Sequence, residues 1–108
     1  MPFYDPSRVR PKTLAPGVTL RVVWGDKVML SLVEMEPGST VQAHTHPHEQ
    51  AGIVLEGEFE FFIGKEKRVL RKGEMYLIPA NVEHGATRVP VLTRALDVFS
   101  PPREEYKQ

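Results

Sequence analysis

Residues 38–50 read Gly38-Ser-Thr-Val-Gln-Ala-His44-Thr-His46-Pro-His-Glu-Gln50 and are followed by Gly57, and residues 73–84 read Gly73-Glu-Met-Tyr-Leu-Ile-Pro79-Ala-Asn-Val-Glu-His84. Residues two apart on a β-strand point to the same face, so His44 and His46 are expected to present two imidazoles side by side. Gln50 has the same parity, but it follows Pro47, which indicates that the chain turns there into an antiparallel neighbouring strand.

His84 lies far along the chain from these residues. It reaches them only if the sheet curls so that non-adjacent strands face each other, and closure into a barrel supplies that geometry. The spacing therefore predicts one metal site made by His44, His46, Gln50 and His84. Glu49 is the alternative fourth ligand, since a one-residue shift in the turn would present it, but its parity is wrong for the inner face. His48 is expected at the wet mouth of the barrel.

Short apolar runs separated by turn signals fill the chain, and no convincing amphipathic helix is present. The predicted strands cover 19–24, 28–35, 40–46, 50–55, 58–63, 68–70, 75–78, 84–89 and 91–99. This pattern predicts an all-β sandwich closing into a barrel. We divide the chain into an N-terminal arm or edge strand (1–18), the barrel (19–99) and a C-terminal tail (100–108).

Length and charge limit the possible functions. The 108 residues make one domain, and the formal net charge is zero, so no basic face is expected to attract nucleic acid or anionic lipid. The absence of cysteine excludes disulfides and thiolate metal sites. No apolar run approaches the length of a membrane span, and the first residues lack a signal core, so a cytoplasmic protein is expected.

Several strands are apolar on both faces, as in residues 91–99. One face fills the barrel and the other needs cover. A second subunit is the expected cover, which predicts a symmetric homodimer. The alternative is that the N-terminal arm folds over this face.

The two histidine stretches resemble the cupin superfamily, whose motifs read G-x5-H-x-H-x3,4-E-x6-G and G-x5-P-x-G-x2-H-x3-N. The first motif keeps every spacing from Gly38 to Gly57, with Gln50 in place of the family's glutamate. The second departs at Asn81, where the family has glycine, and at Arg88, where it has asparagine. Asparagine tolerates the left-handed turn conformation that glycine usually supplies. The resemblance implies a cupin double-stranded β-helix, that is, a jelly-roll barrel.

With glutamine instead of the family's glutamate at position 50, the ligand set has one negative charge fewer, and all four ligands around a divalent ion are neutral. Such a site keeps its full positive charge for an anionic substrate group such as a carboxylate. Imidazole and amide ligands suit nickel, manganese, iron, zinc or cobalt, so the spacing predicts one divalent transition metal without identifying it.

Asp97 shares parity with Phe99 in the last apolar strand. A carboxylate on a buried face is costly unless something pairs with it. It either forms a structural salt bridge with an arginine or is a poised acid or base beside the metal, and position alone does not decide between the two.

The segment Ala95-Leu-Asp97-Val-Phe99-Ser-Pro-Pro-Arg103-Glu-Glu-Tyr, together with the histidine stretches, is similar to the KdgF family of cupins, named for pectin degradation. That resemblance implies action on 4,5-unsaturated uronate monomers from pectin or alginate, which are converted to a linear keto form. By position, His44, His46, Gln50 and His84 would hold the metal, Asp97 and Arg103 would be catalytic, and Phe99 and Arg103 would bind the sugar.

Two other functions remain open at this point. A site with three histidines and an oxygen ligand also resembles quercetinase-type dioxygenases. A non-catalytic barrel that binds sugar with the help of a metal is the third possibility.

Overall fold

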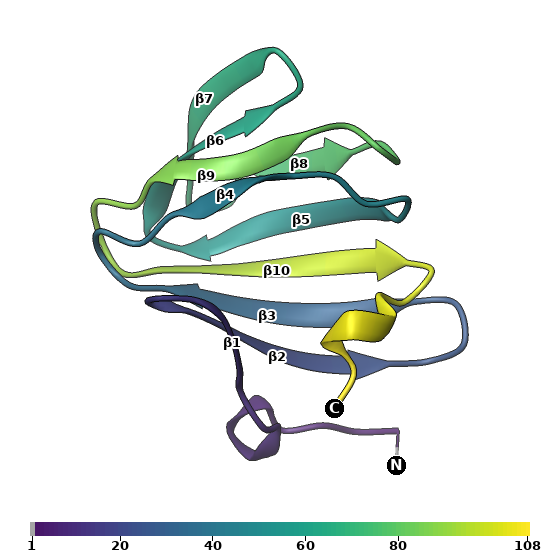
Figure 1. The fold of residues 1–108 in the computed structure, drawn as a ribbon. Helices are drawn as coiled ribbons and strands as arrows, with labels where there is room; N and C mark the ends of the chain where they lie inside the picture. Colours follow the sequence, from purple (N-terminus) through teal and green to yellow (C-terminus); the bar gives the residue numbers. More distant parts are fainter. Residues whose placement is uncertain (1) are drawn as a thin grey trace.

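The computed structural model describes residues 2–108, which form two antiparallel β-sheets packed face to face (Figure 1). The strands are β1 (Lys12–Ala15), β2 (Val18–Trp24), β3 (Met29–Met35), β4 (Val41–His44), β5 (Glu49–Glu56), β6 (Glu58–Ile63), β7 (Glu66–Arg71), β8 (Met75–Ile78), β9 (His84–Arg88) and β10 (Thr93–Ser100). Two short 3-10 helices, η1 (Pro6–Arg8) and η2 (Glu104–Tyr106), lie outside the sheets. The strand orders are β1-β2-β3-β10-β5-β8 and β4-β9-β6-β7. The predicted all-β jelly-roll class is confirmed.

The nine predicted strands correspond to β2 through β10. The strand predicted over residues 40–46 ends earlier, at His44, because the chain already bends through residues 45–48 into β5 and Pro47 has no N–H for a ladder. Strand β1 lies within the segment expected to be an arm or edge strand, and it pairs with β2 at the edge of the larger sheet.

The core lies between the sheets and follows from the alternation of apolar residues along each strand. In β2, Val18, Leu20 and Val22 are buried while the residues between them are partly exposed. The same alternation in β10 buries Thr93, Ala95, Asp97 and Phe99. Successive side chains of a strand point to opposite faces, so each strand contributes every second residue to the core. None of the elements described for residues 2–108 is a helix long and apolar enough to cross a bilayer.

The outer face of the six-stranded sheet is also apolar. One row across five strands contains, by register, Leu77, Ala51, Val98, Leu30 and Val23, and the next row contains Met75, Ile53, Leu96 and Leu32. Several of these side chains reach solvent, among them Met75 and Leu77, which are 75% and 59% exposed. The prediction that strands carry apolar residues on both faces is confirmed for this sheet.

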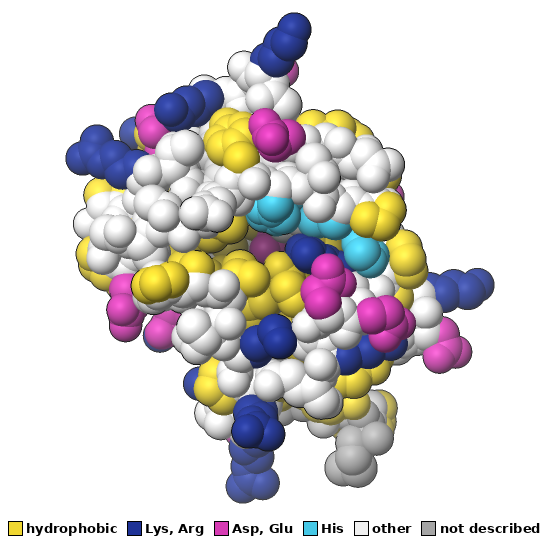
Figure 2. All heavy atoms as spheres, in the orientation of Figure 1, with side chains coloured by type: hydrophobic (Ala, Val, Ile, Leu, Met, Phe, Trp, Pro, Cys, Tyr) yellow, Lys and Arg dark blue, Asp and Glu magenta, His cyan; other side chains and the backbone are white. Residues whose placement is uncertain are grey.

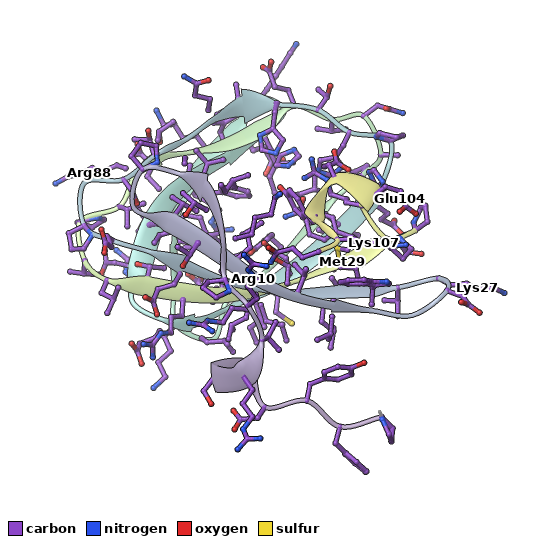
Figure 3. The ribbon with its side chains drawn as sticks, turned by 60° about the horizontal axis from the view of Figure 1, so that its bottom comes forward. Arg10, Lys27, Met29, Arg88, Glu104 and Lys107 are labelled. Atoms are coloured by element: carbon purple, nitrogen blue, oxygen red, sulfur yellow. The ribbon has the colours of Figure 1, made fainter. Side chains whose placement is uncertain are left out.

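The N-terminal segment passes below this outer face without covering it (Figures 1 and 3). Arg21 fixes the segment by donating hydrogen bonds to the carbonyl oxygens of Pro6 and Val9. Beyond this anchor, Phe3 and Tyr4 remain 87% and 57% exposed, and a groove separates them from Leu30 and other outer-face residues.

The C-terminal tail folds back onto the barrel near the end of the β2–β3 hairpin. Tyr106 is buried in the core, Lys107 lies over the ring of Trp24, and Gln108 donates a hydrogen bond to the carbonyl oxygen of Arg10. Figure 3 shows Glu104 and Lys107 on this side of the molecule, above Met29. The tail therefore contributes Arg103 and Tyr106 to the lining of the hollow between the two sheets.

Candidate metal centre

A hollow opens between the two sheets, with histidine side chains at its rim and both acidic and basic groups inside it (Figure 2). Its volume is about 520 Å³, including the part open to solvent. The polar lining residues are Ser31, His44, Gln50, His84, Asp97 and Arg103, and the rest of the lining is apolar or aromatic.

Three histidines converge at this hollow. One ring nitrogen from each of His44, His46 and His84 lies within 4.8 Å of the others. The ring of His84 is 4.3 Å from that of His44 and 4.8 Å from that of His46, measured between centroids. Two strands and one loop therefore bring the three predicted imidazoles to one point.

The Nδ1 atoms of all three rings face backbone carbonyl oxygens. Nδ1 of His44 lies 2.8 Å from the oxygen of Gln42, that of His46 lies 3.1 Å from the oxygen of His48, and that of His84 lies 2.9 Å from the oxygen of Val82. His46 faces an oxygen acceptor at both ring nitrogens, because its Nε2 lies near Oε1 of Gln50. For His44 and His84 the only partner among the described residues is a carbonyl, which can only accept, so Nδ1 carries the proton and Nε2 keeps a lone pair. Such contacts fix the tautomer and orientation that a metal ligand requires.

Gln50 completes the group from the larger sheet. Its Oε1 lies 3.0 Å from Nε2 of His46, and its side chain is buried. Glu49, the alternative ligand, is exposed on the other face of β5. The side chain near the histidines is thus the amide at position 50.

One geometric expectation was wrong. His84 was expected on a strand not adjacent to that of His44, but β4 and β9 are hydrogen-bonded neighbours, and His44 lies directly opposite His84. An irregularity between Val41 and His44 shifts the register of β4, so that Val41 pairs with Ala86 and both β4 residues line the hollow. β-bulges re-aim side chains in this way.

The turn before β9 holds the loop that carries His46. Asn81 has φ 66°, the left-handed conformation expected for a residue in the family's glycine position, which confirms that expectation. Its backbone N–H donates to the carbonyl oxygen of His46 at 2.8 Å. This contact joins the two histidine stretches.

Burial keeps two of the histidines neutral. Desolvation lowers the pKa of His84 to about 4, and desolvation, with the nearby Arg103 guanidinium, lowers the pKa of His46. Nε2 of His84 is buried and has no hydrogen-bond partner within residues 2–108. A buried polar atom without a partner costs about 1–3 kcal/mol, and a metal ion would satisfy it. The donor set therefore fits a divalent transition metal.

Asp97 lies inside the same hollow, on β10. Burial raises the pKa of its carboxyl to about 6, against the lowering effect of hydrogen bonds from Tyr76 and Gln50. No arginine forms an ion pair with it in the described part of the chain; its Oδ1 accepts a hydrogen bond of 2.5 Å from the hydroxyl of Tyr76. Of the two sequence-based alternatives for Asp97, the structural salt bridge is therefore absent from residues 2–108.

Tyr76 was not identified from the sequence. The signal that points to it is Gly52, a lone glycine inside an apolar strand, which often marks a close approach. A Cβ at Gly52 would lie 2.3 Å from the Tyr76 ring and 2.5 Å from Oδ1 of Asp97.

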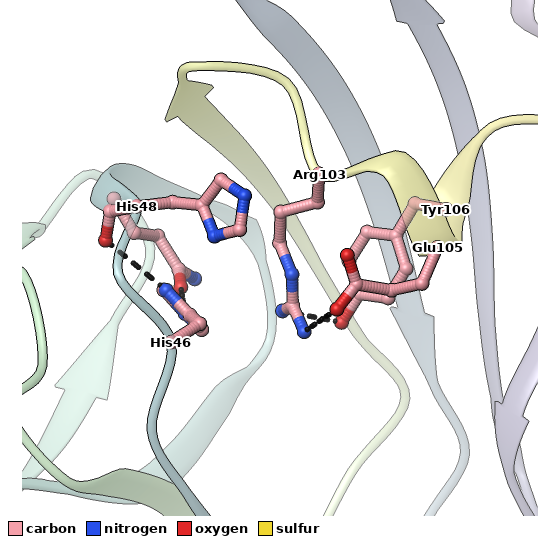
Figure 4. A network of polar contacts seen from close by, with 6 residues as sticks. His46, His48, Arg103, Glu105 and Tyr106 are labelled. Carbon is pink, nitrogen blue, oxygen red and sulfur yellow. Dashed lines mark hydrogen bonds and ion pairs between the residues drawn. The ribbon is translucent and has the colours of Figure 1, made fainter.

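Arg103 turns inward from the tail and is 7% exposed. Its guanidinium lies over the rings of Tyr106 and Phe99, at 4.1 Å and 5.4 Å from their centroids. It donates to the Tyr106 hydroxyl and pairs with Glu105, while its Nε has no partner within residues 2–108 (Figure 4). The structure thus places Asp97, Phe99 and Arg103 around one hollow with the histidines. His48 is half-buried, and its ring faces Arg103 (Figure 4).

Comparison with known proteins identifies the family. The model of the cupin domain matches residues 31–95. The Pectin degradation protein KdgF of Dickeya dadantii (strain 3937) is 32% identical over 95 residues, which cover 86% of each chain. This chain belongs to the KdgF family of cupins. Among solved structures, KdgF from Halomonas sp. superposes with a TM-score of 0.89 and 27% identity, covering 97% of this chain and 99% of that one. An RmlC-like cupin from Shewanella frigidimarina NCIMB 400 has a TM-score of 0.92 and 26% identity, covering 99% and 96%.

Proposed function

We propose that this KdgF-family cupin opens the ring of 4,5-unsaturated uronate monosaccharides and releases the linear keto form. The observation that carries this proposal is the position of Asp97, a buried carboxyl with a pKa of about 6 in the hollow that also holds the histidine group. The relationship to a pectin degradation protein supports the substrate class.

The four ligands of the proposed site are neutral: the Nε2 atoms of His44, His46 and His84, and Oε1 of Gln50. A divalent ion held by them would supply undiminished positive charge for the sugar carboxylate and for the negative charge that develops on the ring oxygen. Glutamate at position 50 would cancel part of that charge, so the amide suits an anionic substrate.

Ring opening is an isomerisation and needs no second substrate. The proton of the anomeric hydroxyl leaves, carbon 1 becomes a carbonyl, and its bond to the ring oxygen breaks. The ring oxygen becomes the ketone oxygen at carbon 5, and carbon 4 gains a proton. A carboxylate that takes the first proton can return it to carbon 4, and a pKa near the working pH suits both transfers. We assign these transfers to Asp97.

Arg103 and Phe99 are the proposed substrate contacts. The guanidinium has a buried Nε–H that finds no partner among residues 2–108, and it carries the positive charge that an anionic sugar group requires. Phe99 lies beside the ring of His46, with centroids 5.7 Å apart, and gives the hollow an apolar wall against the sugar ring.

The direct test uses protein loaded with one divalent metal at a time and unsaturated uronate monomer prepared with a lyase. Loss of the ultraviolet absorbance of the double bond reports ring opening, and we expect a rate well above that in buffer. Consumption of oxygen would instead identify a dioxygenase, and binding without turnover would identify a sugar-binding barrel. A rate equal to that in buffer would overturn the proposal.

We also propose that two copies of the chain associate through the outer face of the six-stranded sheet. The two rows that cross this face are apolar from Leu77 to Val23 and from Met75 to Leu32. At their border, Arg94 pairs with Glu34 and Glu56, so this edge carries both signs of charge. A surface that is apolar at its centre and mixed in charge at its rim suits a two-fold interface with an identical surface. A cytoplasmic location remains a prediction.

A further inference from the structure

A row of four residues crosses the inner face of the larger sheet beside the metal centre. Register pairs Tyr76 of β8 with Gly52 of β5, Gly52 with Asp97 of β10, and Asp97 with Ser31 of β3. Tyr76 and Asp97 are therefore separated by a whole strand, and their side chains meet because the residue between them has no side chain. Ser31, on the other side of Asp97, is fully buried, and its Oγ has no partner in the described residues.

The contact between Tyr76 and Asp97 leaves little freedom to either side chain. The Tyr76 hydroxyl donates to Oδ1 of Asp97, and the ring packs against Phe61, with centroids 5.2 Å apart. The backbone of Gly52 lies directly beneath both groups, so close that even a methyl group would collide with them. A carboxylate held on a rigid sheet by a fixed donor is preorganised for reaction.

We propose that Tyr76 is the positioning residue that aims the Asp97 carboxylate into the hollow, and that Gly52 provides the space for it. This inference rests on the proposed function, because it assigns a role in that reaction. The Tyr76 hydroxyl remains a donor throughout, since burial and the adjacent Asp97 raise its pKa well above the usual value. With Oδ1 engaged by Tyr76, Oδ2 is the oxygen that exchanges protons with the sugar.

The variant Tyr76→Phe tests the assignment in the metal-loaded enzyme. The expected result is a roughly ten- to hundredfold lower kcat with KM changed less than about threefold, because a misplaced group slows the chemical step more than binding. The matched control is Thr93→Val. It also removes a buried hydroxyl on the inner face, one that binds the carbonyl oxygens of Glu58 and Val91 and does not line the hollow. This control should lose stability but keep kcat within about twofold.

A crystal structure of each metal-free protein gives a readout that does not depend on turnover. In the parent protein Asp97 should occupy one rotamer with Tyr76 in hydrogen-bond contact, and in Tyr76→Phe the carboxylate should turn or take several conformers. An unmoved Asp97 in Tyr76→Phe, or a kcat equal to that of the parent, would overturn the assignment. If the parent itself opens no ring, the proposed function fails, and the position of Asp97 in the two crystals still decides whether Tyr76 holds it.

Discussion

Oε1 of Gln50 lies 3.0 Å from Nε2 of His46, and the amide of the same Gln50 also acts on Asp97, whose pKa it lowers. One neutral side chain thus contacts both the proposed ligand group and the proposed acid–base group. Glutamate could serve the first contact, but it has no N–H for the second.

Gln50→Glu should therefore separate metal binding from activity. The added negative charge should tighten divalent metal binding by about tenfold or more, because opposite charges attract strongly in a partly buried site. The loss of the donor beside Asp97 should lower kcat by at least about tenfold. Calorimetric metal titration and the ultraviolet assay measure the two effects. Weaker metal binding together with full activity would show that position 50 does not link the two groups.

His84→Ala should abolish stable metal binding. It removes one of three converging imidazoles, and we expect the metal affinity to fall by at least about a hundredfold. His48→Ala is the matched control: His48 lies in the same part of the chain, but its ring is outside the group of three. Metal content after dialysis, measured by emission spectroscopy, reports both variants. Equal losses in the two variants would contradict the ligand assignment.

Asp97→Asn should change how the stability of the metal-free protein depends on pH. The carboxyl pKa is raised from 3.8 to about 6 in the folded protein. A raised pKa means that the folded state binds the proton more tightly than the unfolded state does. The stabilisation that the protonated Asp97 carboxyl gives the folded state is therefore present below about pH 4 and is lost as the pH rises through 6. As the pH rises from 4 to 7, the parent loses this stabilisation and Asp97→Asn does not. The free energy of unfolding of the variant relative to that of the parent should thus rise by up to about 3 kcal/mol.

Urea unfolding of both metal-free proteins at several pH values checks this. His84, with its pKa lowered to about 4, titrates in both proteins and contributes little to the difference between them. Parallel stability curves for the parent and for Asp97→Asn would mean that Asp97 ionises normally in the folded protein.

Leu30→Glu should weaken association between copies. Leu30 lies in the apolar row of the outer face and is 41% exposed. A charge there would have to be desolvated in a face-to-face dimer. Leu92→Glu is the control, because Leu92 is equally exposed but lies in the turn before β10, outside that face. Light scattering after size exclusion should show a dimer for the parent and the control and a monomer for Leu30→Glu. A monomeric parent would refute the proposed assembly.

The sequence was sufficient to locate most strands along the chain and to predict that His44, His46, Gln50 and His84 come together. Short apolar runs between turn signals located nine of the ten strands described for residues 2–108, and the spacing of His44, His46, Gln50 and His84 matched a known motif. Asn81 could be interpreted as a left-handed residue because few side chains tolerate that conformation.

Features that depend on two distant segments could not be predicted in this way. The irregularity in β4 that turns both Val41 and His44 inward has no local sequence signal. The partner of Asp97 was missed because Tyr76 belongs to a strand that is not its neighbour and contacts it only across Gly52. Arg103 follows two prolines, and only the fold of the tail shows that it turns into the hollow.

Anomalous diffraction at the absorption edge of a metal soaked into crystals of the parent protein shows whether His44, His46, Gln50 and His84 together hold one metal ion. We expect one peak per chain, about 2.0–2.2 Å from Nε2 of His44, His46 and His84 and at a similar distance from Oε1 of Gln50. A peak at some other group of residues, or none at saturating metal, would rule out these four side chains as the ligands.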